Sequence, residues 1–362
     1  MPLLSEPRWS TLPWQLDVRD IHRRSEQNRI AKVDAVNQSQ SLLSGVPLVE
    51  SPFFSETLPQ LEFDERTKAV AFQLHREGWA IIDFPDPEID LVAERIKKSL
   101  HSRFDWDSWQ AKGWRDNDAL RIQDAYEFSA DVQRVAANPE ILRLLSTLYG
   151  RRAWPFQTLN FPVGGQQHFH PDSVHFSSVP ERFGCAVWVA LEDIGPNQGP
   201  LMYYSGSHKW PIYVNEHIGR CRARESGPPS SQPFEALWEA LVRVNAVEAD
   251  RFFAKKGQAF IWTANLLHAG SRQTDPNLTR WSQETHYYFE GCSYYSPMES
   301  DPFYGHIVFQ SLRNIANGEP MPNMYCGHRV PSWFVRGMTS RTIWERRLRN
   351  KLRRGFATSG DR

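Results

Sequence analysis

The residue types best suited to chemistry lie between Gly165 and Phe176, in the run GQQHFHPDSVHF. His170 and Asp172 are two positions apart, and on an extended strand that spacing directs both side chains to the same face. Far along the chain, His268 directly follows an apolar run that is typical of a strand. Two imidazoles and one carboxylate on one side of a metal form the facial triad of non-heme Fe(II) oxygenases, which leaves the opposite positions open. The pattern predicts that these three residues bind a metal ion.

A second pair of histidines competes with this triad. His168 lies two positions before His170, so these two imidazoles could share a face and bind the metal without Asp172. Arg280 favours the triad that includes Asp172. It follows His268 by twelve positions (280 − 268 = 12). A guanidinium is the preferred bidentate partner of a carboxylate.

The order of two close ligands, a distal histidine and a trailing arginine resembles the phytanoyl-CoA dioxygenase family of Fe(II)/2-oxoglutarate oxygenases. The resemblance covers roughly Asp83 to Tyr295 and departs from the family pattern at Ser205, where proline is usual. The blocks that carry it are RIQDAY from Arg121, FQTLNF from Phe156, WVALED from Trp188 and GPLMYYSGSHK from Gly199.

This resemblance implies Fe(II) bound by the triad, with 2-oxoglutarate and O2 as co-substrates and ascorbate as the reductant in vitro. Arg280 is then expected to bind the distal carboxylate of 2-oxoglutarate, although Arg272 lies closer to His268 in the sequence. Further candidate contacts to the co-substrate are Gln167, Ser271 and Asn160. Candidate residues of the substrate pocket are His168, His175, Trp188 and Tyr203. His208, in the Gly-Ser-His segment, is expected to be structural.

The reaction that the resemblance implies is hydroxylation of an unactivated C–H bond of a small molecule, with succinate and CO2 as co-products. Two other classes compete with it. A zinc or manganese barrel could act as an isomerase or hydrolase, since the same ligands accept other divalent ions, and a silent binding module could retain the fold. Arg280 argues against both, because a hydrolase does not need it and a silent module would be free to lose it.

Composition narrows the class of partner. The chain has 362 residues, and Lys+Arg and Asp+Glu both total 42, so the formal net charge is +0. This balance argues against a nucleic-acid or membrane-surface protein. The N-terminus shows no signal pattern, and no apolar run reaches the roughly 18 residues that a membrane span requires. Four cysteines without a Cys-x-x-Cys pair predict reduced thiols in a cytoplasmic protein.

Helical patterns come first and strand patterns follow, which predicts an α+β fold with a jelly-roll barrel. Gly78 and Asn138-Pro139 are expected to end or break helices. The helical ranges are 64–77, 86–100 and 130–149, and the strand ranges are 153–163, 183–192, 201–205, 258–263 and 279–289. The family resemblance implies a double-stranded β-helix with the iron near one end.

Three segments surround this barrel. Residues 1–60 are expected to form an N-terminal arm, and residues 61–295 the catalytic domain. An insertion at about 209–257 could be a lid over the site or only a surface excursion. Residues 296–362 are expected to form a C-terminal helical extension, with a helix at 306–316 and a basic tail. In that tail Trp344, Leu348 and Leu352 form a stripe that could dock on its own domain or on a membrane surface.

Overall fold

The computed structural model describes residues 43–111, 120–165, 167–225, 230–335 and 338, all within the compact unit Gln38–Arg362. The first part of the arm and the stripe of Trp344, Leu348 and Leu352 lie outside these residues, so the predictions for them remain predictions. Among the described helices, none combines the length and the apolar character that crossing a membrane demands.

The first long helix, α3 (Glu65–Glu77), begins and ends where the sequence predicts. The Asp64 side chain accepts a hydrogen bond from the Thr67 N–H, and Gly78 ends the helix with a φ of 85°. A Cβ at Gly78 would lie 2.4 Å from Nδ1 of His208, so both the backbone conformation and the close approach require glycine. Strand β1 (Trp79–Asp83) follows directly.

The predicted helical region 130–149 is two helices, α6 (Ala130–Ala136) and α7 (Pro139–Tyr149). The Asn138 side chain accepts hydrogen bonds from the first free N–H groups of α7, and proline at the first helical position lacks the N–H that would remain unpaired. The other described α-helices are α2 (Phe54–Thr57), α4 (Ile89–Leu100), α5 (Trp106–Ala111) and α8 (Glu235–Asn245).

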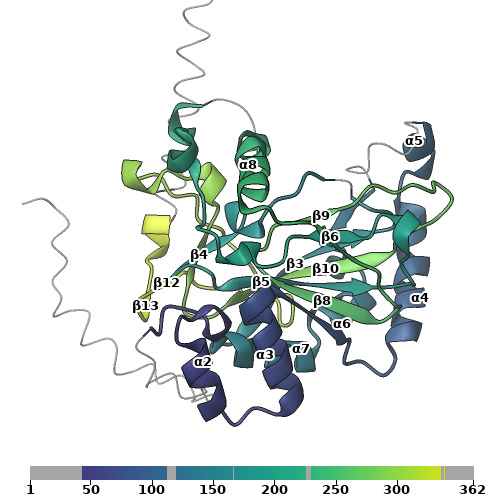
Figure 1. Cartoon of the computed structure of the whole chain (residues 1–362), viewed down its shortest axis with the longest axis horizontal. Helices are drawn as coiled ribbons and strands as arrows, with labels where there is room; N and C mark the ends of the chain where they lie inside the picture. The colour runs from purple at the N-terminus through teal and green to yellow at the C-terminus, as the bar shows by residue number, and fades with distance from the viewer. Residues whose placement is uncertain (1–42, 112–119, 166, 226–229, 336–337, 339–362) are drawn as a thin grey trace, which may run out of the picture. The chain divides into compact units, whose positions relative to one another are not determined.

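Two antiparallel sheets form the barrel (Figure 1). The larger has the strand order β1-β8-β5-β10-β3-β2, and the smaller has the order β7-β6-β9. Their bounds are β8 (Gln258–Thr263), β5 (Gly184–Ala190), β10 (Ser282–Phe289), β3 (Ala153–Phe161), β2 (Ile122–Gln123), β7 (Asp250–Phe252), β6 (Leu201–Tyr203) and β9 (His268–Gly270). Two further pairs are β4 (Ser177–Val179) with β11 (Ser293–Tyr295) and β12 (Met324–Tyr325) with β13 (His328–Arg329).

Helices cover the outer face of the larger sheet, where α3 packs on β1 and both α6 and α7 pack on β3 (Figure 1). The inner face packs against the smaller sheet: Trp188 and Phe260 of the larger sheet form one buried cluster with Leu201 and Phe252 of the smaller. This arrangement confirms the α+β jelly roll, here a double-stranded β-helix with one open polar cavity between its sheets.

The segment 306–316 contradicts the predicted helix. It is extended or irregular, and Phe309 forms a bridge with Tyr295 at the end of β11. The Gln310 N–H donates to the Tyr294 carbonyl at 2.8 Å. Backbone pairing with a distant strand has therefore replaced the local helix, an outcome that local periodicity does not encode.

Described parts of two predicted segments pack on or pair with the barrel. Within residues 43–60, Val49 and Phe54 are buried in the main core, so the end of the predicted arm is part of the domain. Within 209–257, β7 pairs with β6 and belongs to the barrel. The part of the insertion before β7 contains α8, which packs through Trp238 against Phe169 and Tyr204.

Candidate active site

His170 and His268 lie opposite each other in an isolated antiparallel bridge, rather than His170 lying on the long strand that the sequence suggested. Their backbones exchange both hydrogen bonds, of 2.9 Å from the His170 N–H and 3.1 Å from the His268 N–H. Residues paired in this way present their side chains on one face of the ladder. The two imidazole centroids are consequently 4.9 Å apart.

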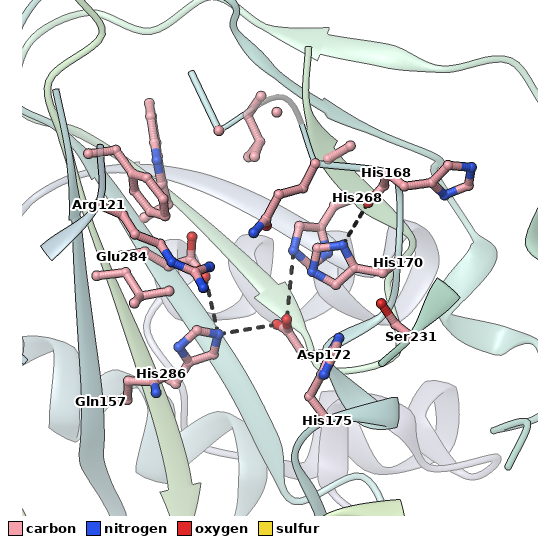
Figure 2. A pocket seen from close by; sticks show the side chains of 18 of the residues that line it. Arg121, Gln157, His168, His170, Asp172, His175, Ser231, His268, Glu284 and His286 are labelled. Atoms are coloured by element: carbon pink, nitrogen blue, oxygen red, sulfur yellow. Dashed lines mark hydrogen bonds and ion pairs between the residues drawn. The ribbon is translucent and has the colours of Figure 1, made fainter. Parts of the chain in front are cut away.

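Asp172 completes the group from the short 3₁₀ turn that follows this bridge, Asp172–Val174. Its Oδ1 lies 3.7 Å from Nε2 of His268, and the ligand atoms of all three residues lie within 4.8 Å of one another (Figure 2). Trp262 of β8 donates its indole N–H to Oδ2 of Asp172 at 2.8 Å. One carboxylate oxygen is thus held by the protein, and the other faces the histidines.

The tautomers of both histidines suit a metal. Nδ1 of His170 lies 2.9 Å from the His168 carbonyl, and Nδ1 of His268 lies 3.0 Å from the Leu266 carbonyl. A carbonyl only accepts, so each Nδ1 carries the hydrogen and each Nε2 keeps its lone pair for a ligand bond. Burial lowers the pKa of His170 to about 3, which keeps this ring neutral at physiological pH.

His168 does not share this geometry. Its Nε2 contacts Oε1 of Glu239 on α8 at 3.2 Å, and Figure 2 shows its ring turned away from Asp172. In the described part of the chain, the only group of side chains placed to hold a metal is His170, Asp172 and His268. The alternative pair of His168 with His170 therefore has no geometric support.

A cavity of about 590 Å³ lies beside the triad, a size typical of small-molecule sites. Arg280 lines it from just before β10 and is only 3% exposed. One of its terminal nitrogens donates to the Gly199 carbonyl at 3.2 Å, while its Nε has no hydrogen-bond partner. The guanidinium carbon lies 5.6 Å from the ring centroid of Trp188.

No carboxylate of the described residues forms an ion pair with Arg280. Burial lowers the pKa of this guanidinium to about 10, an effect that Glu284 partly offsets, so the group stays charged at neutral pH. A buried charge without a partner is unfavourable. The arrangement therefore suits an anion supplied from outside the chain. Arg272, the competing candidate, is exposed and lies outside the lining of the cavity.

The other sequence candidates divide into two groups. Those that line the cavity are Gln167, His168, His175 and Trp188. Asn160, Ser271 and Tyr203 do not. The Ser271 hydroxyl donates to the Pro200 carbonyl at 2.6 Å, and Tyr203 packs between Trp79 and Phe260.

Asn160 is excluded from the cavity by the alternation of strand β3. Gln157, Leu159 and Phe161 line the cavity, so the residue between the last two points to the opposite face. There the Asn160 amide donates to Gln283, whose own amide donates to a carbonyl of α6. This position gives no support to a co-substrate role. His208 is buried against the Gly78 turn and contacts the His75 carbonyl, as expected of a structural histidine.

Two important cavity residues, Glu284 and His286, were missed. Nε2 of His286 lies 3.1 Å from Oε1 of Glu284 and 3.7 Å from Oδ2 of Asp172, although neither contact is aligned as a hydrogen bond (Figure 2). Burial opposes a charge on His286, but the two carboxylates raise its pKa to about 10. Every second residue of a strand points to the same face. Counting in twos from Arg280 would therefore have placed Glu284 and His286 on the same face as Arg280.

The model of a known family, described as phytanoyl-CoA dioxygenase (PhyH), matches residues 61–280, which is more than half of the chain. The chain belongs to the phytanoyl-CoA dioxygenase family. The cofactors of this family are Fe(II) and 2-oxoglutarate, and the neutral, oriented imidazoles and the carboxylate of the triad fit the iron. None of the curated proteins matches this chain.

Several solved structures resemble this phytanoyl-CoA dioxygenase family member at low identity. The non-heme α-ketoglutarate-dependent epimerase SnoN from nogalamycin biosynthesis is 17% identical, with a TM-score of 0.45 over 63% of this chain and 85% of that one. The carbocyclase SnoK from the same biosynthesis is 14% identical, with a TM-score of 0.49 over 72% of this chain and 94% of that one. EctD from S. alaskensis with bound Fe is 18% identical, with a TM-score of 0.46 over 63% of this chain and 77% of that one.

Proposed function

We propose that this protein is an Fe(II)/2-oxoglutarate-dependent dioxygenase that hydroxylates an unactivated C–H bond of a small molecule. The observation that carries the proposal is the buried guanidinium of Arg280, which lines the same cavity as the triad and has no carboxylate partner among the described residues. The distal carboxylate of 2-oxoglutarate supplies such a partner. A zinc or manganese hydrolase has no comparable use for a buried cation.

The bound iron and 2-oxoglutarate supply the oxidation, in which one oxygen atom of O2 enters succinate, the other enters the substrate, and CO2 leaves. The task of the chain is to bind and orient. The backbone carbonyls behind His170 and His268 direct both Nε2 atoms toward one point, and Trp262 holds Asp172 beside them. Arg280 anchors the co-substrate at its far end.

The remaining lining residues then surround the substrate. Gln167 is proposed as a co-substrate contact, and His168, His175 and Trp188 as parts of the substrate wall. Ser231 and Glu235 of the insertion also line the cavity, which supports a role of that segment in covering the site. Closure of this segment as a lid and a cytoplasmic location are parts of the same proposal.

The test is turnover of the purified full chain with Fe(II), ascorbate and 2-oxoglutarate in the presence of metabolite extracts. We expect succinate to form and one extract component to gain a single oxygen atom, which ¹⁸O from labelled O2 should mark in the product. Asp172→Ala should abolish both signals, and Arg272→Ala should retain them. Turnover that needs Zn(II) or Mn(II) but not 2-oxoglutarate would support a hydrolase or isomerase. Formation of succinate together with a product that gains no oxygen atom would show that the reaction is an oxidation other than hydroxylation.

A further inference from the structure

The wall of the cavity formed by β2 and β3 presents polar side chains. Gln157 of β3 is paired with His286 of β10. Gln123 of β2 is paired with Leu159, which in turn is paired with Glu284. Arg121 immediately precedes β2 and also lines the cavity. Hydrogen-bonding groups of three neighbouring strands thus face the same space.

Two of these side chains have no partner in the described part of the chain. Neither the guanidinium of Arg121 nor the amide of Gln157 makes a hydrogen bond or ion pair there, whereas the Gln123 amide donates to Asp124 at 3.1 Å. Figure 2 shows the Arg121 side chain extending toward Glu284 and His286. The acidic group Glu284 already has His286 as its partner, so no carboxylate of the described residues is paired with Arg121.

Arg121 also faces the triad side of the cavity. His175, which follows the Asp172 turn, lines the cavity as well. Arg121 therefore borders the same space as the triad. It is distinct from Arg280, which is buried between Trp188 and Phe161. Among the described residues, Arg280 is thus a buried guanidinium of the cavity and Arg121 an accessible one.

A long hydrocarbon chain fits this wall poorly. Methylene groups against Arg121, Gln157 and His286 would remove water from these groups without replacing its hydrogen bonds, which is unfavourable. A small molecule with oxygen acceptors would replace those bonds. An anionic oxygen group would in addition pair with the guanidinium, which carries planar donors suited to carboxylate and phosphate.

We propose that the substrate is a small polar molecule with a carboxylate or phosphate group, that Arg121 binds this group, and that Gln157 donates a hydrogen bond beside it. The proposal rests on the proposed function for the identity of the reaction, but it concerns binding and can be tested without turnover. It separates a substrate anion at Arg121 from the co-substrate anion at Arg280.

The test uses probes that share a benzene ring and differ in charge: phenyl phosphate, benzoate, benzyl alcohol and benzylammonium. 1-Octanol represents an aliphatic chain. Each is titrated into the metal-free full chain by tryptophan fluorescence, for which Trp188 in the cavity wall is a reporter, and into the anaerobic Fe(II)- and 2-oxoglutarate-loaded protein by visible absorption. The variants are Arg121→Ala and Arg121→Gln, with Arg272→Ala as the matched exposed control and Arg280→Ala as the co-substrate variant.

We expect at least one anionic probe to bind, and both Arg121 variants to weaken it by about tenfold or more. Arg272→Ala should leave this binding unchanged. The stronger of phenyl phosphate and benzoate identifies the group. Unchanged anion binding in the Arg121 variants, loss in Arg280→Ala alone, or no anion binding to the wild type would overturn the proposal. Tighter binding of benzylammonium or 1-octanol would do the same, since it would assign recognition to Glu235 or to apolar groups.

These outcomes are separable from the proposed function. Anion binding that depends on Arg121, in a protein that forms no succinate, would retain this inference and reject the dioxygenase. Succinate formation with anion binding independent of Arg121 would do the reverse. Circular dichroism of the variants checks the fold, and Arg121 is exposed, so neither substitution removes core packing.

Discussion

The two walls of the cavity differ in how their polar groups are used. On the triad wall the protein already holds each ligand: carbonyls accept from His170 and His268, and the Trp262 indole donates to Asp172. On the β2–β3 wall the side chains of Arg121 and Gln157 make no such bonds within the described residues. The side chains of the triad wall are therefore oriented before any ligand binds. On the β2–β3 wall, hydrogen-bonding groups remain available to a bound ligand.

This difference matches two kinds of ligand. A resident metal gains from side chains that are held in place, because outer hydrogen bonds fix the tautomer and the orientation of each ligand. A substrate that must enter and leave gains from groups whose bonds it can complete. Arg280 lies between the two cases, since one nitrogen is held by Gly199 while Nε remains open.

The largest expected effect is on the triad wall. Asp172→Ala removes the only anionic ligand of the proposed site, and we expect loss of detectable hydroxylation and a large fall in Fe(II) affinity, measured by anaerobic metal titration. His168→Ala is the control, because its ring contacts Glu239 and lies apart from the triad. If Asp172→Ala keeps near-normal iron affinity while His168→Ala loses it, the pair of His168 with His170 is the true site.

The second effect concerns Arg280. Arg280→Ala should raise the dissociation constant of 2-oxoglutarate by roughly thirty-fold or more, because truncating one partner of a buried ion pair typically costs on the order of 2–5 kcal/mol. Iron affinity should change little. Lysine should rescue binding only in part, since it keeps the charge without the planar fork.

Anaerobic titration of the Fe(II)-to-oxo-acid absorption band measures the effect of the Arg280 substitutions. The exposed Arg272→Ala serves as the control and should bind 2-oxoglutarate normally. Loss of co-substrate affinity in Arg272→Ala with none in Arg280→Ala would show that the anchor has been assigned to the wrong arginine.

A smaller effect tests whether the hydrogen bond that orients Asp172 matters for iron binding. Trp262→Phe removes the indole donor at 2.8 Å from Asp172 while keeping an aromatic ring in the core. We expect iron affinity to fall by about tenfold, the lower end for loss of a group that orients a ligand. Trp188→Phe is the matched control for Trp262→Phe, because the Trp188 indole N–H has no partner among the described residues. Equal iron affinity in the two variants would mean that the indole does not orient Asp172.

The last effect concerns stability and lies outside the cavity walls, at His208. Burial lowers the pKa of this histidine to about 4, against an ordinary value of 6.5. Between these values the unfolded state binds a proton that the folded state does not. The free energy of unfolding should therefore fall by up to about 1.4 kcal/mol for each pH unit from 6.5 down to 4.

Urea unfolding of the metal-free protein at several pH values measures this dependence at His208. His208→Asn, which does not titrate in this range, should give a shallower pH profile. Parallel profiles for the two proteins would show that His208 does not contribute to the loss of stability in acid.

The sequence by itself determined those features that depend on neighbours along the chain. Helix α3 ends at Gly78 and α7 begins at Asn138-Pro139 because caps and proline act within a few residues. The residue types of the triad are also local properties, and so is the buried face of β10 that continues from Arg280, since the period of a strand is two. The same period contained the positions of Glu284 and His286, which belong to no motif.

The tertiary structure alone decided which distant residues meet. The bridge that joins His170 to His268, and the indole of Trp262 beside Asp172, depend on how strands pair and sheets pack. Long-range pairing also replaced the helix predicted at 306–316 and made β7 part of the barrel. Whether Asn160 or Gln157 reached the cavity depended on which face of β3 the helices cover. Such pairings are stabilised by contacts far apart in sequence, so no local window of residues contains the energy that selects them.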